Sequence, residues 1–298
     1  MAMPPEARVD DALRRAGTVA GVAGLALIVG AGAWLVASGR GEVRYSADHP
    51  DTVALWRLWL PALVGLALTL LVPPRLPRID LLRHAEAAQV RREAAVCTLA
   101  AVAYALVLPL GGRPSPDLWY VGVRLALLVA LPLLVLRSDR RWVPAPPPEE
   151  RPGHWYWTGP AVPVAAWLAL AWFGPFGTPG TAAAAGAPAG PTLLVLVAGG
   201  FVINSLLEEI VYRFWLQTRL ERMLGVWPGV VVASLLWAVW HVAIQGTGDL
   251  TVDIAVALAR HGVLGLFLGA LWARYRNPWA PILLHGAVNA SPAVFLQL

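Results

Sequence analysis

Long apolar runs separated by short polar connections dominate the chain. Each run is close to the ~20 residues that a helix needs to cross ~30 Å of hydrocarbon. The runs, together with the Gly, Pro and charged residues between them, predict nine spans, of which the fifth is short. The predicted spans are 16–38, 53–72, 94–110, 118–136, 159–173, 192–215, 228–244, 252–272 and 278–296. We therefore expect an all-α, polytopic transmembrane bundle of about eight or nine helices.

The composition agrees with a membrane protein. Of 298 residues, 58% are hydrophobic and 14% charged, and the mean hydropathy is +0.61, whereas an average soluble domain has ~25% charged residues. The alternation typical of a β-barrel is absent. Residues 1–17 precede an apolar run that is too long for a signal-peptide core, so we expect a retained first helix.

Arginine supplies all the basic charge, because the sequence contains no lysine. Between the predicted spans, sixteen arginines fall in one set of alternating segments, which includes the N-terminus, and four in the other. Positive residues accumulate in cytoplasmic loops, so the count predicts a cytoplasmic N-terminus in the cytoplasmic (inner) membrane of a prokaryote. We expect these arginines to contact the lipid bilayer. We expect no nucleic acid partner, because basic and aromatic residues do not alternate along the chain as they do in a nucleic-acid-binding surface.

Two linkers interrupt the apolar pattern. Residues 140–153 are proline-rich and charged, and they predict an N-terminal four-helix region, 1–150, followed by a C-terminal bundle, 151–298, with its core at 192–298. Residues 177–191 form an uncharged connection. Cys97 is the only cysteine, which excludes an intrachain disulfide and a thiolate cluster. We find no internal repeat, the usual sign of an inverted-repeat transporter.

Ionisable residues within the predicted spans lie mostly in the C-terminal half. A charge at mid-bilayer costs between about 3 and 17 kcal/mol, depending on the method, so such residues normally face the protein interior and serve a function. Arg124 is the exception in the first half. The others are Glu208, Glu209, Arg213, His241, Arg260, His261 and His285.

Helical spacing sorts the residues around the two glutamates. Glu209 and Arg213 are four apart and can pair on one face, whereas Glu208 points elsewhere and is expected to be the less neutralised carboxylate. A desolvated carboxylate of this kind can act as a general base. Alternatively, both glutamates only join helices through Arg213 and neighbouring donors.

The histidines lie on other predicted helices. His241 shares a face with Trp237, and His285 shares one with Asn289, four residues later. A rise of 1.5 Å per residue places these groups and Glu208 in one layer, in the cytoplasmic to middle part of the membrane. We expect them to line a cavity open to the cytoplasm or laterally to lipid. A single intramembrane histidine is more often structural, but three helices presenting such groups favour a site.

Three short motifs carry a family resemblance: "EEIVYR" (208–213), "WAVWH" (237–241) and "HGAVN" (285–289). In this order they resemble the CPBP family of intramembrane endopeptidases, also called the CAAX prenyl protease and bacteriocin-processing or Abi family. Residues 265–285 are also similar to the family pattern, and the resemblance covers 192–298. Trp237 stands where phenylalanine is commoner. The first four spans carry no motif of the family.

The resemblance implies hydrolysis of a peptide bond in a membrane-associated protein or peptide. Glu208 and His241 would activate water, and His285 and Asn289 would stabilise the oxyanion. Glu209 and Arg213 would hold the site in register. The family's substrates include prenylated C-terminal peptides, bacteriocin leaders and sorting tags, and the sequence does not choose among them.

Three alternatives to this mechanism stay open. Glu208, His241 and His285 are zinc ligands by type, but there is no HExxH and Arg213 opposes a dication, so we expect a glutamate mechanism with no cofactor. The buried Glu and His groups could instead form the relay of a proton-coupled transporter, or an idle scaffold could have inherited the fold. For Arg260 and His261 we expect snorkelling or capping of a cavity.

Overall fold

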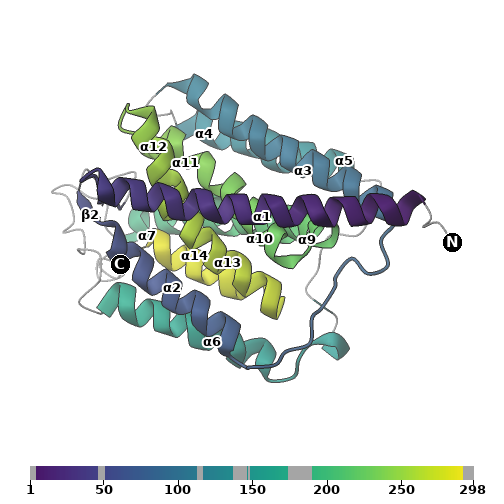
Figure 1. Ribbon diagram of the computed structural model, residues 1–298. Helices are drawn as coiled ribbons and strands as arrows, with labels where there is room; N and C mark the ends of the chain where they lie inside the picture. Colours follow the sequence, from purple (N-terminus) through teal and green to yellow (C-terminus); the bar gives the residue numbers. More distant parts are fainter. Residues whose placement is uncertain are drawn as a thin grey trace.

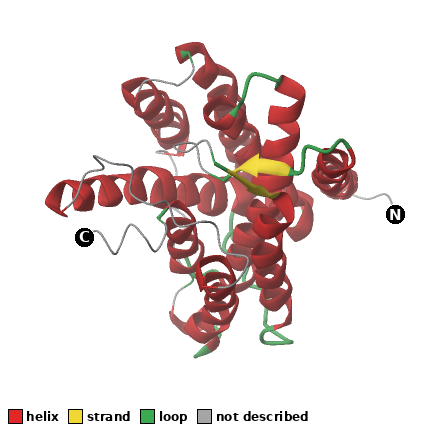
Figure 2. Cartoon of the chain, turned by 90° about the vertical axis from the view of Figure 1, so that its left-hand side faces the viewer, coloured by secondary structure: helices red, strands yellow, loops and turns green. Residues whose placement is uncertain are grey.

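A computed structural model describes residues 5–45, 51–112, 117–136, 146, 148–173 and 190–290. Most residues within these ranges are helical, and most helices run along one common direction (Figure 1). A single two-stranded hairpin lies at one end of the bundle (Figure 2). The expected all-α bundle is thus confirmed in its helical character.

The first part of the chain forms a long helix, the hairpin and several further helices. The hairpin is antiparallel, with Val43 opposite Val53. The elements are α1 (Pro5–Ala37), β1 (Glu42–Arg44), β2 (Thr52–Ala54), α2 (Leu55–Leu71), α3 (Ala87–Val107), the 3-10 helix η1 (Leu108–Gly111), α4 (Asp117–Arg124), the π-helix η2 (Leu125–Ala130) and α5 (Leu131–Leu136).

The second part contains a helical path of 35 residues, Gly190–Leu224, in which α and π segments alternate. Its segments are α7 (Gly190–Gly200), η5 (Phe201–Leu206), α8 (Leu207–Glu209), η6 (Ile210–Gln217) and α9 (Thr218–Leu224). The other elements are η3 (Pro148–Glu150), α6 (Trp155–Leu168), η4 (Ala169–Phe173), α10 (Val226–Val239), α11 (His241–Gln245), α12 (Leu250–Val256), η7 (Ala257–His261), α13 (Gly262–Tyr275) and α14 (Trp279–Asn289).

Six helical segments of the described chain are long and apolar enough to cross a membrane, by length and composition. They are Arg8–Ala37, Ala87–Gly111, Leu118–Val135, Gly190–Leu224, Val226–Gln245 and Leu250–Tyr275. Leu55–Leu71 is apolar but shorter. An integral membrane protein is therefore supported, while the number of nine spans and the orientation of the N-terminus stay predictions.

The two predicted regions share one buried core. Tyr104 and Leu128 from the first region belong to the same cluster of buried side chains as Trp237 and Phe267 from the second. Close approach between helices depends on glycine: a Cβ added at Gly265 of α13 would lie 2.9 Å from Ser234 Cβ of α10. The proposed boundary near residue 150 stays a prediction, but the two regions pack as one body.

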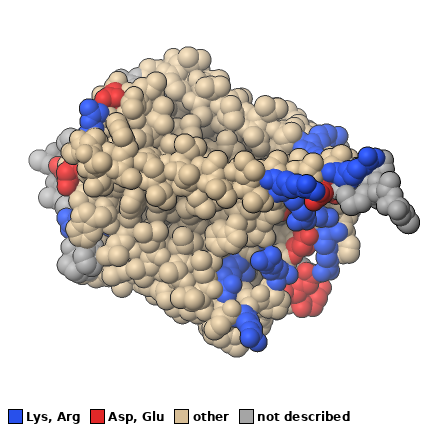
Figure 3. Space-filling model, viewed as in Figure 1, with Lys and Arg blue, Asp and Glu red and all other residues tan. Residues whose placement is uncertain are grey.

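The surface shows where charge is tolerated. In the view of Figure 3, a broad band without charged residues covers the middle of the bundle, and arginines gather at the end where α1 begins. Large apolar side chains are exposed on the outer helices, for example Val19 (70%), Leu106 (69%) and Val195 (70%). Such an apolar outer surface is expected where helices face lipid.

Candidate active site

Glu208 and Glu209 occupy the middle of the 35-residue helical path. Both lie in the three-residue segment α8, with π-helical turns on either side, η5 and η6. π-Helical turns are rare and frequently occur at functional sites. The glutamate side chains are buried, with relative exposures of 2% and 0%. A buried carboxylate needs a cation or hydrogen-bond donors, so their partners define the site.

Glu209 is held by two groups. Arg213 Nε lies 3.3 Å from Oε2, so the structure brings the predicted pair together. His285 Nδ1 lies 2.8 Å from Oε1. Because a carboxylate oxygen only accepts, Nδ1 carries the proton in this contact. The other ring nitrogen of His285, Nε2, faces Glu208 Oε2 at 4.0 Å.

Glu208 has its own cation, which the sequence analysis did not assign to it. Arg124 Nη1 of α4 lies 3.0 Å from Oε1, and Trp237 Nε1 of α10 donates to Oε2 at 2.6 Å. The expectation that Glu208 is the less neutralised carboxylate was therefore wrong. Counting the charges within the predicted spans could have indicated this pair. Two buried glutamates need two cations, Arg213 supplies only one, and Arg124 is the arginine that we noted within a predicted span of the first region.

Several buried polar atoms of the two arginine–glutamate pairs have no hydrogen-bond partner among the residues that the structure describes. They are Arg124 Nη2, Glu209 Oε2 and the three side-chain nitrogens of Arg213, although Arg213 keeps its ion pair and stacks 5.1 Å from the Trp237 ring. Buried polar groups left without a protein partner call for water or a ligand as their partner. The region around the glutamates therefore offers donors and an acceptor to a small polar molecule.

His241 lies beside Trp237. Its Nδ1 donates to the Trp237 carbonyl oxygen at 3.0 Å, and its ring stacks on His261 with centroids 3.7 Å apart and planes 18° apart. The Trp237 ring contacts both His241 and His285, with centroid distances of 4.8 and 5.4 Å. His241 makes no hydrogen bond or ion pair to Glu208. The expected activation of one water by both residues stays a prediction.

Asn289 lies near the end of α14, one turn beyond His285. Its Nδ2 donates to Ser205 Oγ of η5 at 3.1 Å. His285 is buried, whereas Asn289 is exposed. The amide is thus connected to the helix that bears the glutamates, and it lies at the edge of the site.

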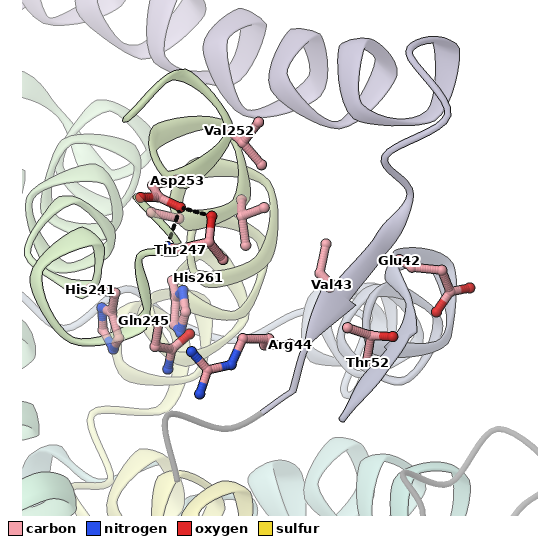
Figure 4. Close-up of a pocket in the computed structure, with 12 residues that line it drawn as sticks. Glu42, Val43, Arg44, Thr52, His241, Gln245, Thr247, Val252, Asp253 and His261 are labelled. Carbon is pink, nitrogen blue, oxygen red and sulfur yellow. Dashed lines mark hydrogen bonds between the residues drawn. The ribbon is translucent and has the colours of Figure 1, made fainter. Parts of the chain in front are cut away.

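A cavity of about 100 Å³ opens at the hairpin end of the bundle. His241 and His261 line it together with Arg44, Thr52 and Asp253, as Figure 4 shows. Glu208 and His285 are not among its lining residues. We expected a cavity open to the cytoplasm or to lipid, but this one lies at the end that the arginine count assigns to the opposite side of the membrane.

Arg260 bonds to groups of the hairpin and of α11, and its expected snorkelling or capping of a cavity stays a prediction. Its Nη1 donates to the Arg44 carbonyl oxygen at 2.6 Å and to Gln245 Oε1 at 2.8 Å, and Nη2 bonds to the Tyr45 carbonyl. These bonds tie the hairpin to α11 beside the cavity.

The described residues do not fit a metal ion. No group of three His, Cys, Asp or Glu side chains among them converges as a metal site requires. In particular, Glu208 and His285 face each other at 4.0 Å, while His241 makes no contact with Glu208.

The family comparison covers this part of the chain. Residues 190–291 match the family model described as "Type II CAAX prenyl endopeptidase Rce1-like". This segment is similar to the family model, and we call it the Rce1-like domain. It agrees with the resemblance of the three motifs to the CAAX protease family, and it supports an intramembrane endopeptidase. The match spans about a third of the chain, so Arg124 and the hairpin lie outside the Rce1-like domain. No curated protein and no solved structure matches the chain.

Proposed function

We propose that the protein is an intramembrane endopeptidase that hydrolyses a peptide bond by a glutamate-activated water. The observation that carries the proposal is the arrangement of Glu208 Oε2 and His285 Nε2, which face each other at 4.0 Å inside the Rce1-like domain. Glu209 supports the arrangement, because its contact with Nδ1 leaves Nε2 directed at Glu208.

The distance of 4.0 Å suits one bridging water. With His285 neutral and its proton on Nδ1, both facing atoms are acceptors. A water that donates to both at ~2.8 Å would subtend an angle of about 90°, close to the angle between its own two O–H bonds. Oε2 keeps a lone pair for it beside the indole donor of Trp237. We therefore place the attacking water between Glu208 and His285.

In the proposed reaction, Glu208 takes one proton from this water as the oxygen adds to the carbonyl carbon of the scissile bond. Glu208 then gives the proton to the leaving amine nitrogen as the C–N bond breaks. General base help of this kind contributes ~10²- to 10⁴-fold. Glu209 and Arg213 orient His285, and Asn289 is the proposed oxyanion donor at the edge of the site. Removing one such donor costs about 3 to 4 kcal/mol.

The two histidines receive different roles from those that the resemblance implied. His285 holds the water with Glu208, because it is the imidazole that faces Glu208 Oε2. His241 keeps a role in water activation from the cavity side: its Nδ1–H is bound to a carbonyl, so Nε2 can accept a hydrogen bond from a water in the cavity and orient it.

No metal takes part in the proposed mechanism. The glutamates are matched to two guanidinium groups, Arg124 and Arg213, and a dication between them would add repulsion in a low dielectric.

We also propose that the substrate is a membrane-associated protein or peptide. The family name makes prenylated CAAX peptides the first class to test, with bacteriocin leaders and sorting tags as the other classes.

Reconstitution tests the function against the transporter alternative. Purified protein in proteoliposomes receives a farnesylated peptide with a C-terminal CAAX sequence, the same peptide without the farnesyl group, and a mixture of membrane-anchored peptides. Mass spectrometry reads cleavage, and a pH-sensitive dye in the lumen reads proton movement. We expect new peptide termini and no proton flux. Proton flux coupled to a solute, with every peptide left intact, would replace the endopeptidase by a transporter.

A further inference from the structure

Arg124 forms an ion pair with Glu208 from outside the Rce1-like domain. It ends α4, and its side chain is fully buried, with a relative exposure of 0%. Its Nη1 lies 3.0 Å from Glu208 Oε1, and no second carboxylate of the described residues pairs with it. An arginine buried among apolar helices is costly unless it is paired, so this contact accounts for its place in the bundle.

The guanidinium is held in one orientation by groups from three helices. Nε donates to the Tyr104 hydroxyl of α3 at 3.1 Å, and Nη1 donates to the Ile203 carbonyl at 2.9 Å and to Asn204 Oδ1 at 3.0 Å. Tyr120 donates to the same Asn204 oxygen at 3.0 Å. The Tyr120 ring lies 4.2 Å from Arg124 Cζ. Such a network fixes the cation relative to the helix that bears Glu208.

The two carboxylate oxygens of Glu208 contact different groups. Oε1 faces Arg124, whereas Oε2 faces Trp237 and His285. Arg213 lies within ion-pair distance of Glu209 only. Without Arg124, Glu208 would be a buried carboxylate with no cation in contact, a state that strongly favours the neutral acid. A neutral acid is not a base.

We propose that Arg124 is a positioning residue of the active site, contributed by the N-terminal region, which fixes Glu208 as an oriented carboxylate with Oε2 turned to His285. The inference rests on the proposed function, because it concerns the same glutamate. It gives the first helices a role in catalysis that the Rce1-like match does not include.

A second buried pair supplies a matched control. Arg219 Nε of α9 lies 2.7 Å from Glu93 Oε2 of α3, and both side chains are buried, with exposures of 1% and 4%. This pair also joins the N-terminal region to the Rce1-like domain. If arginine in such a place only holds helices together, removing Arg219 or Arg124 should have the same consequences.

The experiment compares Arg124→Met, Arg124→Lys and Arg219→Met in proteoliposomes, with kcat, KM and the thermal unfolding midpoint measured for each. We expect Arg124→Met to lower kcat at least ~100-fold with KM within about threefold. Arg124→Lys should have a kcat at least ~10-fold higher than that of Arg124→Met, because lysine restores the positive charge. It should stay below the wild type, because lysine lacks the planar guanidinium group. Arg219→Met should lower the midpoint and leave kcat within about threefold. Wild-type kcat in Arg124→Met, or equal losses in both methionine variants, would overturn the proposal.

Infrared spectroscopy gives a readout that does not depend on turnover. Arg124→Met should show a protonated-carboxyl stretch that is absent from the wild type and from Arg124→Met/Glu208→Gln. The double variant also leaves no buried charge uncompensated, so if Arg124→Met unfolds, a higher unfolding midpoint in the double variant supports Glu208 as the group that Arg124 balances, and an equally low midpoint contradicts it. If the wild type cleaves no peptide, the proposed function fails, and this band still decides whether Arg124 fixes the charge of Glu208. Absence of the band in folded Arg124→Met would contradict the inference.

Discussion

His285 Nδ1 and Glu209 Oε1 lie 2.8 Å apart, although 76 residues separate them in the chain. The contact joins α14 to the glutamate-bearing helix and fixes which nitrogen of the imidazole carries a proton. It also turns Nε2 towards Glu208 Oε2 at 4.0 Å. Adjacent glutamates thereby receive different tasks: Glu209 orients the histidine, and Glu208 faces the position that we assign to the attacking water.

Replacing Glu209 by Gln should weaken the orientation of His285 and remove one buried charge. A glutamine can present either its oxygen or its NH2 group to His285 Nδ1, so it fixes the imidazole less firmly than a carboxylate does, and it no longer balances Arg213. We expect kcat to fall about 10- to 100-fold, less than in a Glu208 variant, and the thermal unfolding midpoint to fall because Arg213 is left as an uncompensated buried charge.

The double variant Glu209→Gln/Arg213→Met is the control for stability. It should unfold at a higher temperature than Glu209→Gln alone while its kcat stays low, because the charge imbalance is removed but the orientation of His285 is not restored. Wild-type kcat in Glu209→Gln would show that Glu209 has no part in placing the imidazole.

Replacing His241 by Ala should abolish cleavage without loss of folded protein in the membrane, with kcat reduced at least ~100-fold. His261→Ala is the matched control, since the two rings stack at 3.7 Å and line the same cavity. We expect His261→Ala to keep kcat within about threefold. Steady-state cleavage of one peptide by both variants measures the difference, and wild-type turnover in His241→Ala would remove this residue from the mechanism.

The arrangement of the site could be predicted from the sequence only as far as local geometry reaches. The pairing of Glu209 with Arg213 follows from their spacing of four residues, and the three motifs identified the helices that carry the polar groups. The pairing of Arg124 with Glu208 spans 84 residues and depends on how α4 packs, which no hydropathy pattern contains. A charge count alone could have indicated it.

Other differences have similar causes. The hydropathy of the helix at 190–224 is the same whether its turns are α or π, so the π-helical turns around the glutamates were not predictable from it. The strands at 42–44 and 52–54 have three residues each, too few for an alternating pattern. The cavity at this hairpin was therefore missed. The shared face of Trp237 and His241 followed from their spacing, but only the packed structure brings the Trp237 ring against His285 of α14.

Exhaustive chelation should leave the activity unchanged. The described residues offer no group of three converging metal ligands, and the proposed base is a carboxylate bound to Arg124. We expect kcat within about twofold of the untreated enzyme after dialysis against a strong chelator, with elemental analysis of the same sample. Stoichiometric metal in the purified protein, together with activity that chelation removes and zinc restores, would contradict the glutamate mechanism.

The most direct test of the central claim is the turnover of a membrane-anchored peptide by Glu208→Gln in proteoliposomes, beside the wild type and Glu93→Gln. Glutamine keeps the size of the side chain but cannot take a proton from water, and Glu93 is an equally buried glutamate paired with Arg219 outside the site. We predict that Glu208→Gln lowers kcat at least ~10³-fold while remaining folded, and that folded Glu93→Gln keeps the wild-type kcat. Cleavage by Glu208→Gln at the wild-type rate would contradict the account.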